Sequence, residues 1–549
     1  MSSRLKWKKQ LNHQLKIITL QQLGLILLFL IGCIYTTVTL ISLINDHHFL
    51  YNLEPYPDGL LYSLIGRNLA LGRGLQLVYD EQVLKSLVPT FYPIILSLGY
   101  LFNSAPATYV FINTILGLVT IAFLYHLLVS LTKSIWLGLG GIVIYLSHAY
   151  LWLLPTLPMT ENLSLCLFII CLWLLFKSHW RLIEIIGFIL ALTALALSRF
   201  AAIPTSLVLF LLLVTKILRQ VSGRQRIIFL FLLSLSGLMI TGGLRLMGLD
   251  WLFIIKDFYI NITKPIPSGH FSFAYVKDNL ISYSQICLGL KAKFLWYRWP
   301  LTSLVLSTAT LLSLINIHIK KQIRWGLFCL ILAQFPLVLL LIGADARYLI
   351  LLIPLLTIGT VLFWQMISAY LKRWQLFGLG SGLILLLLIP QLPIFKQILT
   401  ANFFHRTRAW QYEAILNFNN FFQHRPDSTL ISALPPFLVD AYQTSAYSLL
   451  PMSQRQEFLA KKEYVWGKNI NYDDLMAEYQ QRLAGGGKLY ISNAYITHQW
   501  EVVADYEKLK QQFKLTKVAD GCQDACNIYQ LSLPTSALPN PAKSKNSVK

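Results

Sequence analysis

Long runs of apolar residues, separated by short polar or charged stretches, fill the chain from residue 20 to residue 393. Many of these runs approach the ~20 apolar residues that an α-helix needs to cross a bilayer. The pattern therefore predicts a polytopic α-helical membrane protein with about eleven spans. We place the spans at residues 20–43, 109–131, 134–154, 162–176, 182–197, 203–218, 227–247, 299–319, 325–343, 348–370 and 374–393.

The first outer loop, residues 45–108, contains two shorter apolar stretches. Residues 57–74 carry apolar side chains at helical spacing, and Asp58 stands where a helix start favours a carboxylate. Glycines at 72 and 74 suit the end of the same helix. A second stretch, residues 88–102, contains two prolines. Both stretches are too short or too polar to span, so we expect two helices that lie in the membrane interface.

The composition changes near residue 397 to that of a soluble α/β domain. We expect four strands, at residues 428–433, 488–492, 514–518 and 527–531. We expect helices at residues 406–423, 436–442, 472–483 and 501–512. The predicted organisation is a basic N-terminus at 1–19, a transmembrane domain at 20–396 with outer loops 45–108 and 248–298, a small α/β domain at 397–533, and a disordered tail at 534–549.

The distribution of charge indicates the topology. The chain of 549 residues has 46 basic and 24 acidic residues, a net charge of +22. Basic residues gather in every second short loop, which the positive-inside rule explains without a nucleic-acid partner. These residues are Lys133, Lys177, Arg181, Arg219, Arg224, Arg226, Lys320, Lys321, Arg324, Lys372 and Arg373. We therefore predict a cytoplasmic N-terminus and an extracytoplasmic C-terminal domain.

Four charged residues from distant parts of the chain reach the outer membrane face: Asp58, Glu161, Arg199 and Arg347. Charges at membrane level are rare, and two acids with two arginines suit a reaction on a phosphorylated lipid. The arginine fork binds phosphate, and a carboxylate accepts a proton from a hydroxyl. Each residue has a simpler alternative. Asp58 and Glu161 would cap helices, and Arg199 would extend to lipid headgroups.

Lys85 and Tyr92 flank the second interfacial stretch and are further candidates for the phosphate site. The first outer loop has no Asp-X-Asp pair, which argues against a strongly bound divalent metal. We therefore expect no cofactor, and a weakly bound, non-essential divalent ion stays open.

Cys522 and Cys526 lie close together in a polar, turn-rich connection between two predicted strands. In an oxidising compartment such a pair favours a disulfide that closes a short loop. The alternative is two unrelated thiols.

These motifs together resemble the GT-C-fold membrane glycosyltransferases of the family that includes protein O-mannosyltransferases and lipid A aminoarabinose transferases. The resemblance rests on the Asp58 helix with its Arg-Asn-Leu-Ala-Leu-Gly-Arg-Gly end, on Phe91-Tyr92-Pro93, on Thr160-Glu161, on Ser198-Arg199 and on Arg347-Tyr348. An α/β domain after the last span is a further common feature.

The resemblance implies an enzyme of the bacterial plasma (inner) membrane that takes a sugar from a polyprenyl-phosphate donor. The acceptor would be a lipid, a glycan or a protein outside the cytoplasm. It implies that Asp58 is the general base and that Glu161 assists in orientation. Arg347, Arg199, Lys85 and Tyr92 would bind the lipid phosphate. The family often has Asp-Glu where this chain has Asp58-Gly59. An inactive scaffold of the same fold therefore stays open, as does a transporter of lipid-linked sugars.

Overall fold

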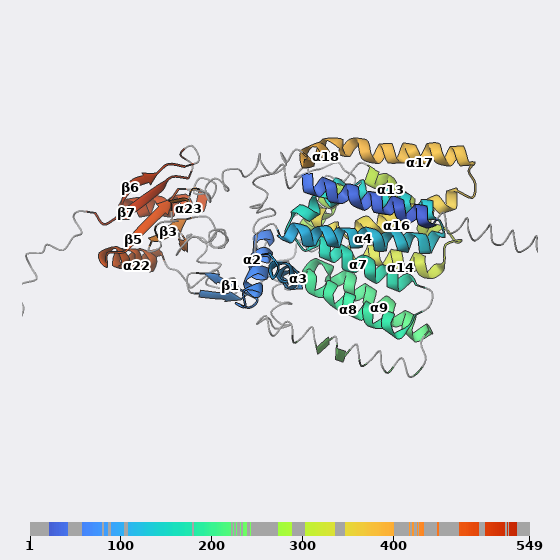
Figure 1. Cartoon of the computed structure of the whole chain (residues 1–549), viewed down its shortest axis with the longest axis horizontal. Coiled ribbons are helices and arrows are strands. Elements are labelled where there is room, and N and C mark those ends of the chain that lie inside the picture. The colour runs from blue at the N-terminus through green and yellow to red at the C-terminus, as the bar shows by residue number, and fades with distance from the viewer. Residues whose placement is uncertain are drawn as a thin grey trace, which may run out of the picture. The chain divides into compact units, whose positions relative to one another are not determined.

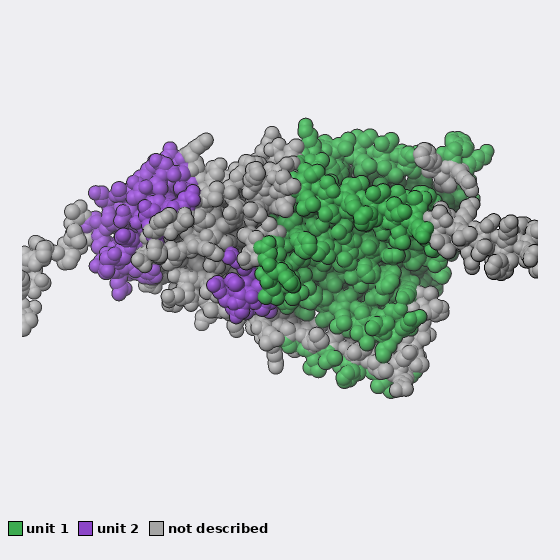
Figure 2. All heavy atoms as spheres, viewed as in Figure 1, with its two compact units in different colours: residues 1–66, 87–403 green, residues 67–86, 404–549 purple. Residues whose placement is uncertain are grey.

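The structure is a computed structural model of the chain. It describes residues 21–41, 58–79, 82–85, 89, 91–103, 108–177, 180–220, 273–287, 302–334, 346–399, 428–432, 447–449, 472–493, 500–521 and 526–534, with a few single positions between them. The chain divides into two compact units (Figure 2). Unit 1 comprises residues 1–66 and 87–403, and unit 2 comprises residues 67–86 and 404–549. Each unit is described by itself.

Unit 1 is helical, and its long helices run side by side (Figure 1). Its helices are Gln21–Ile41, α2 (Asp58–Ala70, which ends in unit 2), α3 (Phe91–Tyr100), α4 (Thr108–Thr132), α5 (Ile135–Leu146), α6 (Ala149–Leu153), α7 (Glu161–Phe176), α8 (Leu182–Ser198), α9 (Ile203–Gln220), α12 (Phe273–Cys287), α13 (Thr302–Ile315), α14 (Lys321–Leu332), α16 (Leu352–Ile367), α17 (Arg373–Leu388) and α18 (Leu392–Leu399). Short 3₁₀ turns occur at η2 (Leu154–Thr156), η3 (Phe200–Ala202), η5 (Ala346–Leu349) and η6 (Ile389–Gln391). Helix α4 packs on α5 and α7, α7 packs on α8, and α16 packs on α5 and α13.

Only some of the predicted spans have the length of a complete membrane crossing. Among the described residues, Gln21–Ile41 and Thr108–Thr132 are long and apolar enough, and one bent pair of helices adds a third. Seven further apolar helices are 10–17 residues long. At 1.5 Å per residue, even a helix of 17 residues covers only about 26 Å of the ~30 Å hydrocarbon layer. The described helices therefore include two or three complete crossings, where the sequence predicts about eleven spans, and the span at 227–247 lies largely outside the described residues.

The predicted span at 134–154 is wrong as a single helix. Its two parts, Ile135–Leu146 and Ala149–Thr156, meet at 77°. Side chains from other helices satisfy backbone carbonyls after the break. Tyr35 donates to the Leu151 carbonyl oxygen at 3.3 Å, and Asn113 donates to that of Leu157 at 2.6 Å. A break inside an apolar region is tolerated where such partners replace the lost helical hydrogen bonds.

The outer loop predicted at 248–298 is not wholly irregular, because it contains helix α12. Both stretches of the first outer loop form helices, α2 and α3, although α2 is shorter than its predicted range and α3 begins at Phe91, and their place in the membrane interface stays a prediction. Helix α2 ends as predicted, since Gly72 and Gly74 have φ of +74° and +84°. Gly66 brings α2 against α3, because a Cβ there would lie 2.9 Å from Leu96 Cβ and 3.0 Å from the Pro93 carbonyl oxygen. A side chain at this position would push the two helices apart.

Unit 2 contains a two-stranded antiparallel hairpin, β1 (Gln76–Tyr79) and β2 (Gln82–Lys85), and a five-stranded sheet. The sheet has the order β4-β3-β5-β7-β6, with strands β3 (Ser428–Ser432), β4 (Tyr447–Leu449), β5 (Lys488–Ser492), β6 (Lys514–Ala519) and β7 (Ile528–Ser532). The pairs β4–β3 and β3–β5 are parallel, whereas β5–β7 and β7–β6 are antiparallel. Helices α22 (Tyr472–Ala484) and α23 (Trp500–Gln512) contribute Met476, Tyr479 and Leu509 to a core with Ile431 and Ile491.

Four strands and two helices of this unit are confirmed to within one residue, whereas β4 and the β1–β2 hairpin were missed. The predicted helices at 406–423 and 436–442 lie largely or wholly outside the described residues, as do the N-terminus at 1–19 and the tail from 535.

Candidate functional site

An antiparallel pair of helices brings Glu161 and Arg199 together. Helix α7 begins at Glu161, α8 ends at Ser198, and a five-residue connection joins their other ends, so the first residue of α7 and the residue after α8 meet. The N-terminus of α7 favours the carboxylate and the C-terminus of α8 favours the guanidinium. The two groups form an ion pair with 3.1 Å between Arg199 Nη1 and Glu161 Oε1. The side chains are 9% and 1% exposed, so this charge pair is buried.

Two serines hold the same pair of helix ends. Ser164, one turn into α7, and Ser198, the last residue of α8, have their hydroxyl oxygens 3.1 Å apart. At the opposite ends of these helices Lys177 and Glu184 form a second ion pair. Thr160 occupies the N-cap position of α7, but its side chain makes no capping hydrogen bond. Helix capping together with Thr160 therefore does not account for the presence of a carboxylate at Glu161.

Arg347 joins this cluster from a distant part of the chain. It lies in η5, just before α16. Arg199 Nη2 donates to the backbone carbonyl oxygen of Arg347 at 3.1 Å. Both guanidinium groups lie near the ring of Tyr348, with Cζ-to-centroid distances of 5.7 Å for Arg199 and 5.3 Å for Arg347. Three of the four charged residues selected from the sequence thus meet at one place, and Asp345 lies outside the described residues.

A buried network of amides and one phenol adjoins the α7 end. Tyr92 donates to Asn113 Oδ1 at 3.0 Å, and Asn162 Nδ2 donates to the Asn113 carbonyl oxygen at 3.0 Å. Asn162 directly follows Glu161, so the network links α3, α4 and α7 beside the ion pair. Tyr92 and Asn113 are fully buried. In this structure Tyr92 therefore serves the packing of the site, and its hydroxyl is already engaged.

Helix α2 packs on the same network. Its Tyr62 ring meets the Tyr92 ring edge-on, with 5.6 Å between centroids, and Ser63 Oγ lies 2.5 Å from the Tyr100 hydroxyl. Asp58 is the first residue of α2, one turn before Tyr62. The Asp58 side chain is outside what the structure describes, so its role as base stays a prediction.

Three of the remaining selected residues, Lys85, Cys522 and Cys526, belong to unit 2. Lys85 ends strand β2 of unit 2, and its side chain is not described. Cys526 is bonded in a disulfide, whereas Cys522 lies outside the described residues, so their pairing stays a prediction. Among the described residues, no group of three histidine, cysteine, aspartate or glutamate side chains is placed to hold a metal ion.

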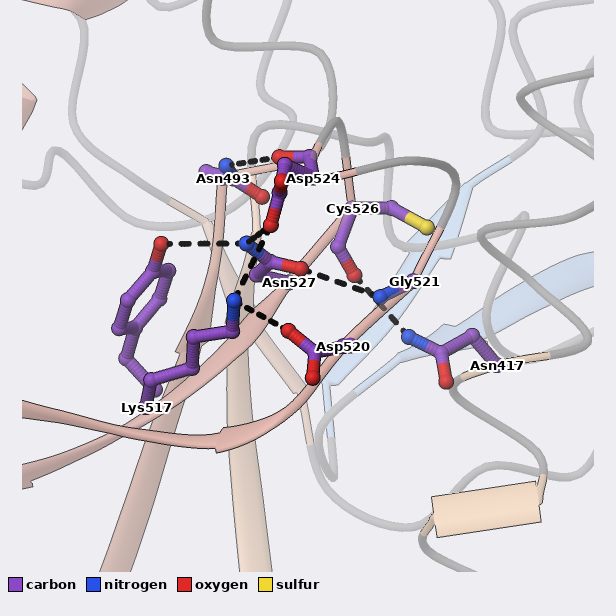
Figure 3. Close-up of polar contacts among 9 residues, drawn as sticks. Asn417, Asn493, Lys517, Asp520, Gly521, Asp524, Cys526 and Asn527 are labelled. Atoms are coloured by element: carbon purple, nitrogen blue, oxygen red, sulfur yellow. Dashed lines mark hydrogen bonds and ion pairs between the residues drawn. The ribbon is translucent and has the colours of Figure 1, made fainter.

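The turn that contains these cysteines is well connected (Figure 3). Lys517 pairs with Asp520 and, at 3.0 Å, with Asp524, and Asn527 Nδ2 donates to Asp524 Oδ1 at 2.9 Å. The hydrogen bonds from Asn527 and Lys517 lower the pKa of Asp524. The hydrogen bonds to Asp520 and Asp524 raise the pKa of Lys517. These groups satisfy one another and hold the β6–β7 connection.

Asn113 and Tyr348 were missed as site residues by the sequence analysis. A buried asparagine in an apolar run is expensive unless it is hydrogen-bonded, which was the available signal for Asn113. Asn162, the first residue of the predicted span at 162–176, is 3% exposed in the structure.

Comparison of the chain with known proteins identifies its fold, through solved structures alone. No family model and no curated protein matches the chain. Among solved structures, ArnT from Cupriavidus metallidurans bound to undecaprenyl phosphate matches with a TM-score of 0.61, over 92% of this chain and 98% of that chain. The chain has the fold of ArnT. The apo state of ArnT matches with a TM-score of 0.56 over 91% of this chain and 97% of that one. Both are 13% identical in sequence.

The match confirms the fold that the resemblance of the sequence motifs implied. ArnT is a GT-C-fold lipid A aminoarabinose transferase, and the match covers nearly the whole chain. At 13% identity the likeness is one of architecture, and it does not favour a mannosyl over another sugar.

Proposed function

We propose that this protein is an integral membrane glycosyltransferase. It moves a sugar from a polyprenyl-phosphate donor to an acceptor on the extracytoplasmic face of a bacterial inner membrane. The observation that carries the proposal is the fold shared along 92% of the chain with a protein solved with undecaprenyl phosphate. The cluster of Glu161, Arg199 and Arg347 supports it, since it gathers two arginines at one end of the helical unit.

The positions of basic residues support the orientation. Lys177 and Arg181 connect α7 to α8 at the end opposite Glu161, and Lys372 follows α16 at the end opposite Arg347. The cluster therefore lies away from the basic loops, on the side that the positive-inside rule assigns to the outside. The N-terminus is accordingly cytoplasmic and the C-terminal domain extracytoplasmic.

The reaction is a displacement at the anomeric carbon with inversion. The acceptor hydroxyl or amine forms the new bond to that carbon, and its proton passes to the Asp58 carboxylate. The bond from the same carbon to the phosphate oxygen breaks, and polyprenyl phosphate leaves with the electron pair. The leaving group is an anion that needs little protonation, so positioning and charge stabilisation by Arg347 and Lys85 dominate.

The test compares Asp58→Asn with the wild type. Asparagine keeps a capping oxygen at the start of α2 but cannot accept the proton. A positioned base contributes about 10²–10⁴ in rate, so turnover falls by at least a factor of about one hundred. The matched control is Asp278→Asn, which neutralises an exposed aspartate on α12 and leaves turnover unchanged.

The assay uses membranes with equal protein levels, supplied with undecaprenyl-phosphate mannose or undecaprenyl-phosphate aminoarabinose. Sugar transfer to membrane acceptors and release of undecaprenyl phosphate are both measured. Turnover above about a tenth of wild type in Asp58→Asn refutes Asp58 as the base. Movement of the intact donor across the membrane without release identifies a transporter, and no reaction with either donor favours an inactive scaffold.

A further inference from the structure

Arg199 has a different environment from Arg347, although both were selected as phosphate ligands. The Arg199 side chain is 9% exposed and lies between the Glu161 carboxylate and the Arg347 backbone carbonyl. Arg347 is half-buried. The two arginines are therefore unequal in their access to a ligand.

The charge of Arg199 is already balanced inside the protein. A buried guanidinium requires a counter-charge, and Glu161, fully buried at the N-terminus of α7, supplies it. One terminal nitrogen of Arg199 faces Glu161 and the other donates to Arg347. The two terminal nitrogens of Arg199, which could bind a phosphate by two parallel hydrogen bonds, thus face groups of the protein itself.

Arg199 also fixes the segment that carries Arg347. It connects the end of α8 to η5, 148 residues later in the chain, through one hydrogen bond. The Tyr348 ring adds a second contact, because both guanidinium groups lie within 6 Å of its centroid. Moving Arg199 would release the Arg347 backbone and change the surroundings of Tyr348.

We propose that Glu161 and Arg199 are positioning residues, which hold Arg347 in place for the phosphate of the polyprenyl carrier. Glu161 orients Arg199, Arg199 orients the Arg347 backbone, and Arg347 contacts the phosphate. The inference deepens the proposed function and rests on it. It assigns Glu161 a role without proton transfer, and it removes Arg199 from the ligands of the lipid phosphate.

The test is direct binding of undecaprenyl phosphate to the purified full-length protein in detergent, with undecaprenol as the uncharged comparison. Arg347→Ala loses the direct contact. Glu161→Gln removes the counter-charge of Arg199 and weakens binding about tenfold, the lower end of the 10–100-fold that residues supporting a ligand contribute at metal sites. Undecaprenol binding stays unchanged in both variants. The matched control is Glu184→Gln, which breaks the ion pair with Lys177 at the other end of the same two helices and leaves binding unchanged.

Arg199→Lys separates positioning from charge. Lysine keeps the positive charge but cannot reach Glu161 and the Arg347 carbonyl with two ends of one planar group. We expect Arg199→Lys to bind as weakly as Glu161→Gln. Binding like the wild type would overturn the proposal. The double variant Glu161→Gln/Arg199→Gln, the neutral pair, leaves no unpaired buried charge, so we expect it to fold. Thermal melting in detergent checks that it does.

The decisive comparison is a cycle between the neutral pair and Arg347→Ala. If the pair acts through Arg347, it costs no further affinity once Arg347 is gone, and the combined variant binds like Arg347→Ala alone. If the costs multiply, Arg199 contacts the phosphate itself and the positioning role is wrong. A wild type that binds undecaprenyl phosphate while Glu161→Gln binds equally well overturns only this inference. A wild type that does not bind the lipid overturns the proposed function too.

Discussion

Replacing Asn113 by alanine should destabilise the helical unit more than most single substitutions do. Asn113 is fully buried and joins three elements, since it accepts from Tyr92 on α3, lies on α4 and donates to the Leu157 carbonyl before α7. Alanine removes these two hydrogen bonds, together with a longer one of 3.5 Å from Asn113 Nδ2 to the Leu154 carbonyl oxygen, and leaves the Tyr92 hydroxyl buried with its partner deleted.

The magnitude follows from the two groups left behind. The Tyr92 hydroxyl is fully buried, and an orphaned buried donor costs about 1–3 kcal/mol. The Leu157 carbonyl oxygen still accepts from the backbone N–H of Met159 at 2.7 Å, so losing its hydrogen bond to Asn113 costs less free energy. For that bond we take the ~0.6 kcal/mol average of hydrogen bonds between membrane helices. The sum is about 2–4 kcal/mol.

The assay is equilibrium unfolding by SDS titration in mixed micelles, followed by tryptophan fluorescence. The cycle with Tyr92→Phe isolates the shared bond, and we expect the double variant to be more stable than the sum of the singles by about 1 kcal/mol. The control is Asn316→Ala, which removes a hydrogen bond to the exposed backbone N–H of His318 and costs less than about 0.5 kcal/mol. An Asn113→Ala cost no larger than this control, or additivity with Tyr92→Phe, would refute the reasoning.

Three further predictions concern the C-terminal domain. A reporter active only outside the cytoplasm, fused after Pro534, should be active, and a stable but inactive fusion would reverse the topology. Thiol labelling of the unreduced, denatured protein should modify neither Cys522 nor Cys526, and labelling of both would exclude the bridge. The lowered pKa of Asp524 adds stability above its unfolded pKa, ~3.9, that is lost as pH falls through the folded pKa. The raised pKa of Lys517 adds stability below ~10.4 that is lost as pH rises through its folded value. Unfolding of the domain should therefore be hardest between these limits, and Asp524→Asn should weaken the acid dependence. An acid dependence identical to wild type contradicts this.

The sequence predicted the elements that local patterns determine. The bounds of α8 were predicted to within one residue, and Gly72 and Gly74 marked the end of α2. Strand β5 was predicted in full because its apolar run follows three glycines, at 485–487, and ends before Asn493. The three-residue β4 is too short to show a pattern of its own, and it depends on β3 for its hydrogen bonds.

The arrangement of the site depended on contacts that no local pattern shows. The break after Leu146 has no proline or glycine at the bend, and carbonyl groups that follow it accept hydrogen bonds from Tyr35 and Asn113 on other helices. The sequence could place Glu161 and Arg199 on the same membrane face from the charge pattern alone. That they pair, and that Arg199 engages the Arg347 backbone, follows only from the packing of α7, α8 and η5.

The central claim is that this protein consumes a polyprenyl-phosphate sugar. Mass spectrometry of lipid-linked sugars and envelope glycans, in cells with and without the protein, measures donor and product together. The account predicts that cells without the protein accumulate one polyprenyl-phosphate sugar and lose that sugar from an envelope acceptor, and that Asp58→Asn reproduces both changes. Unchanged lipid-linked sugars and unchanged glycans in cells that lack the protein would contradict it.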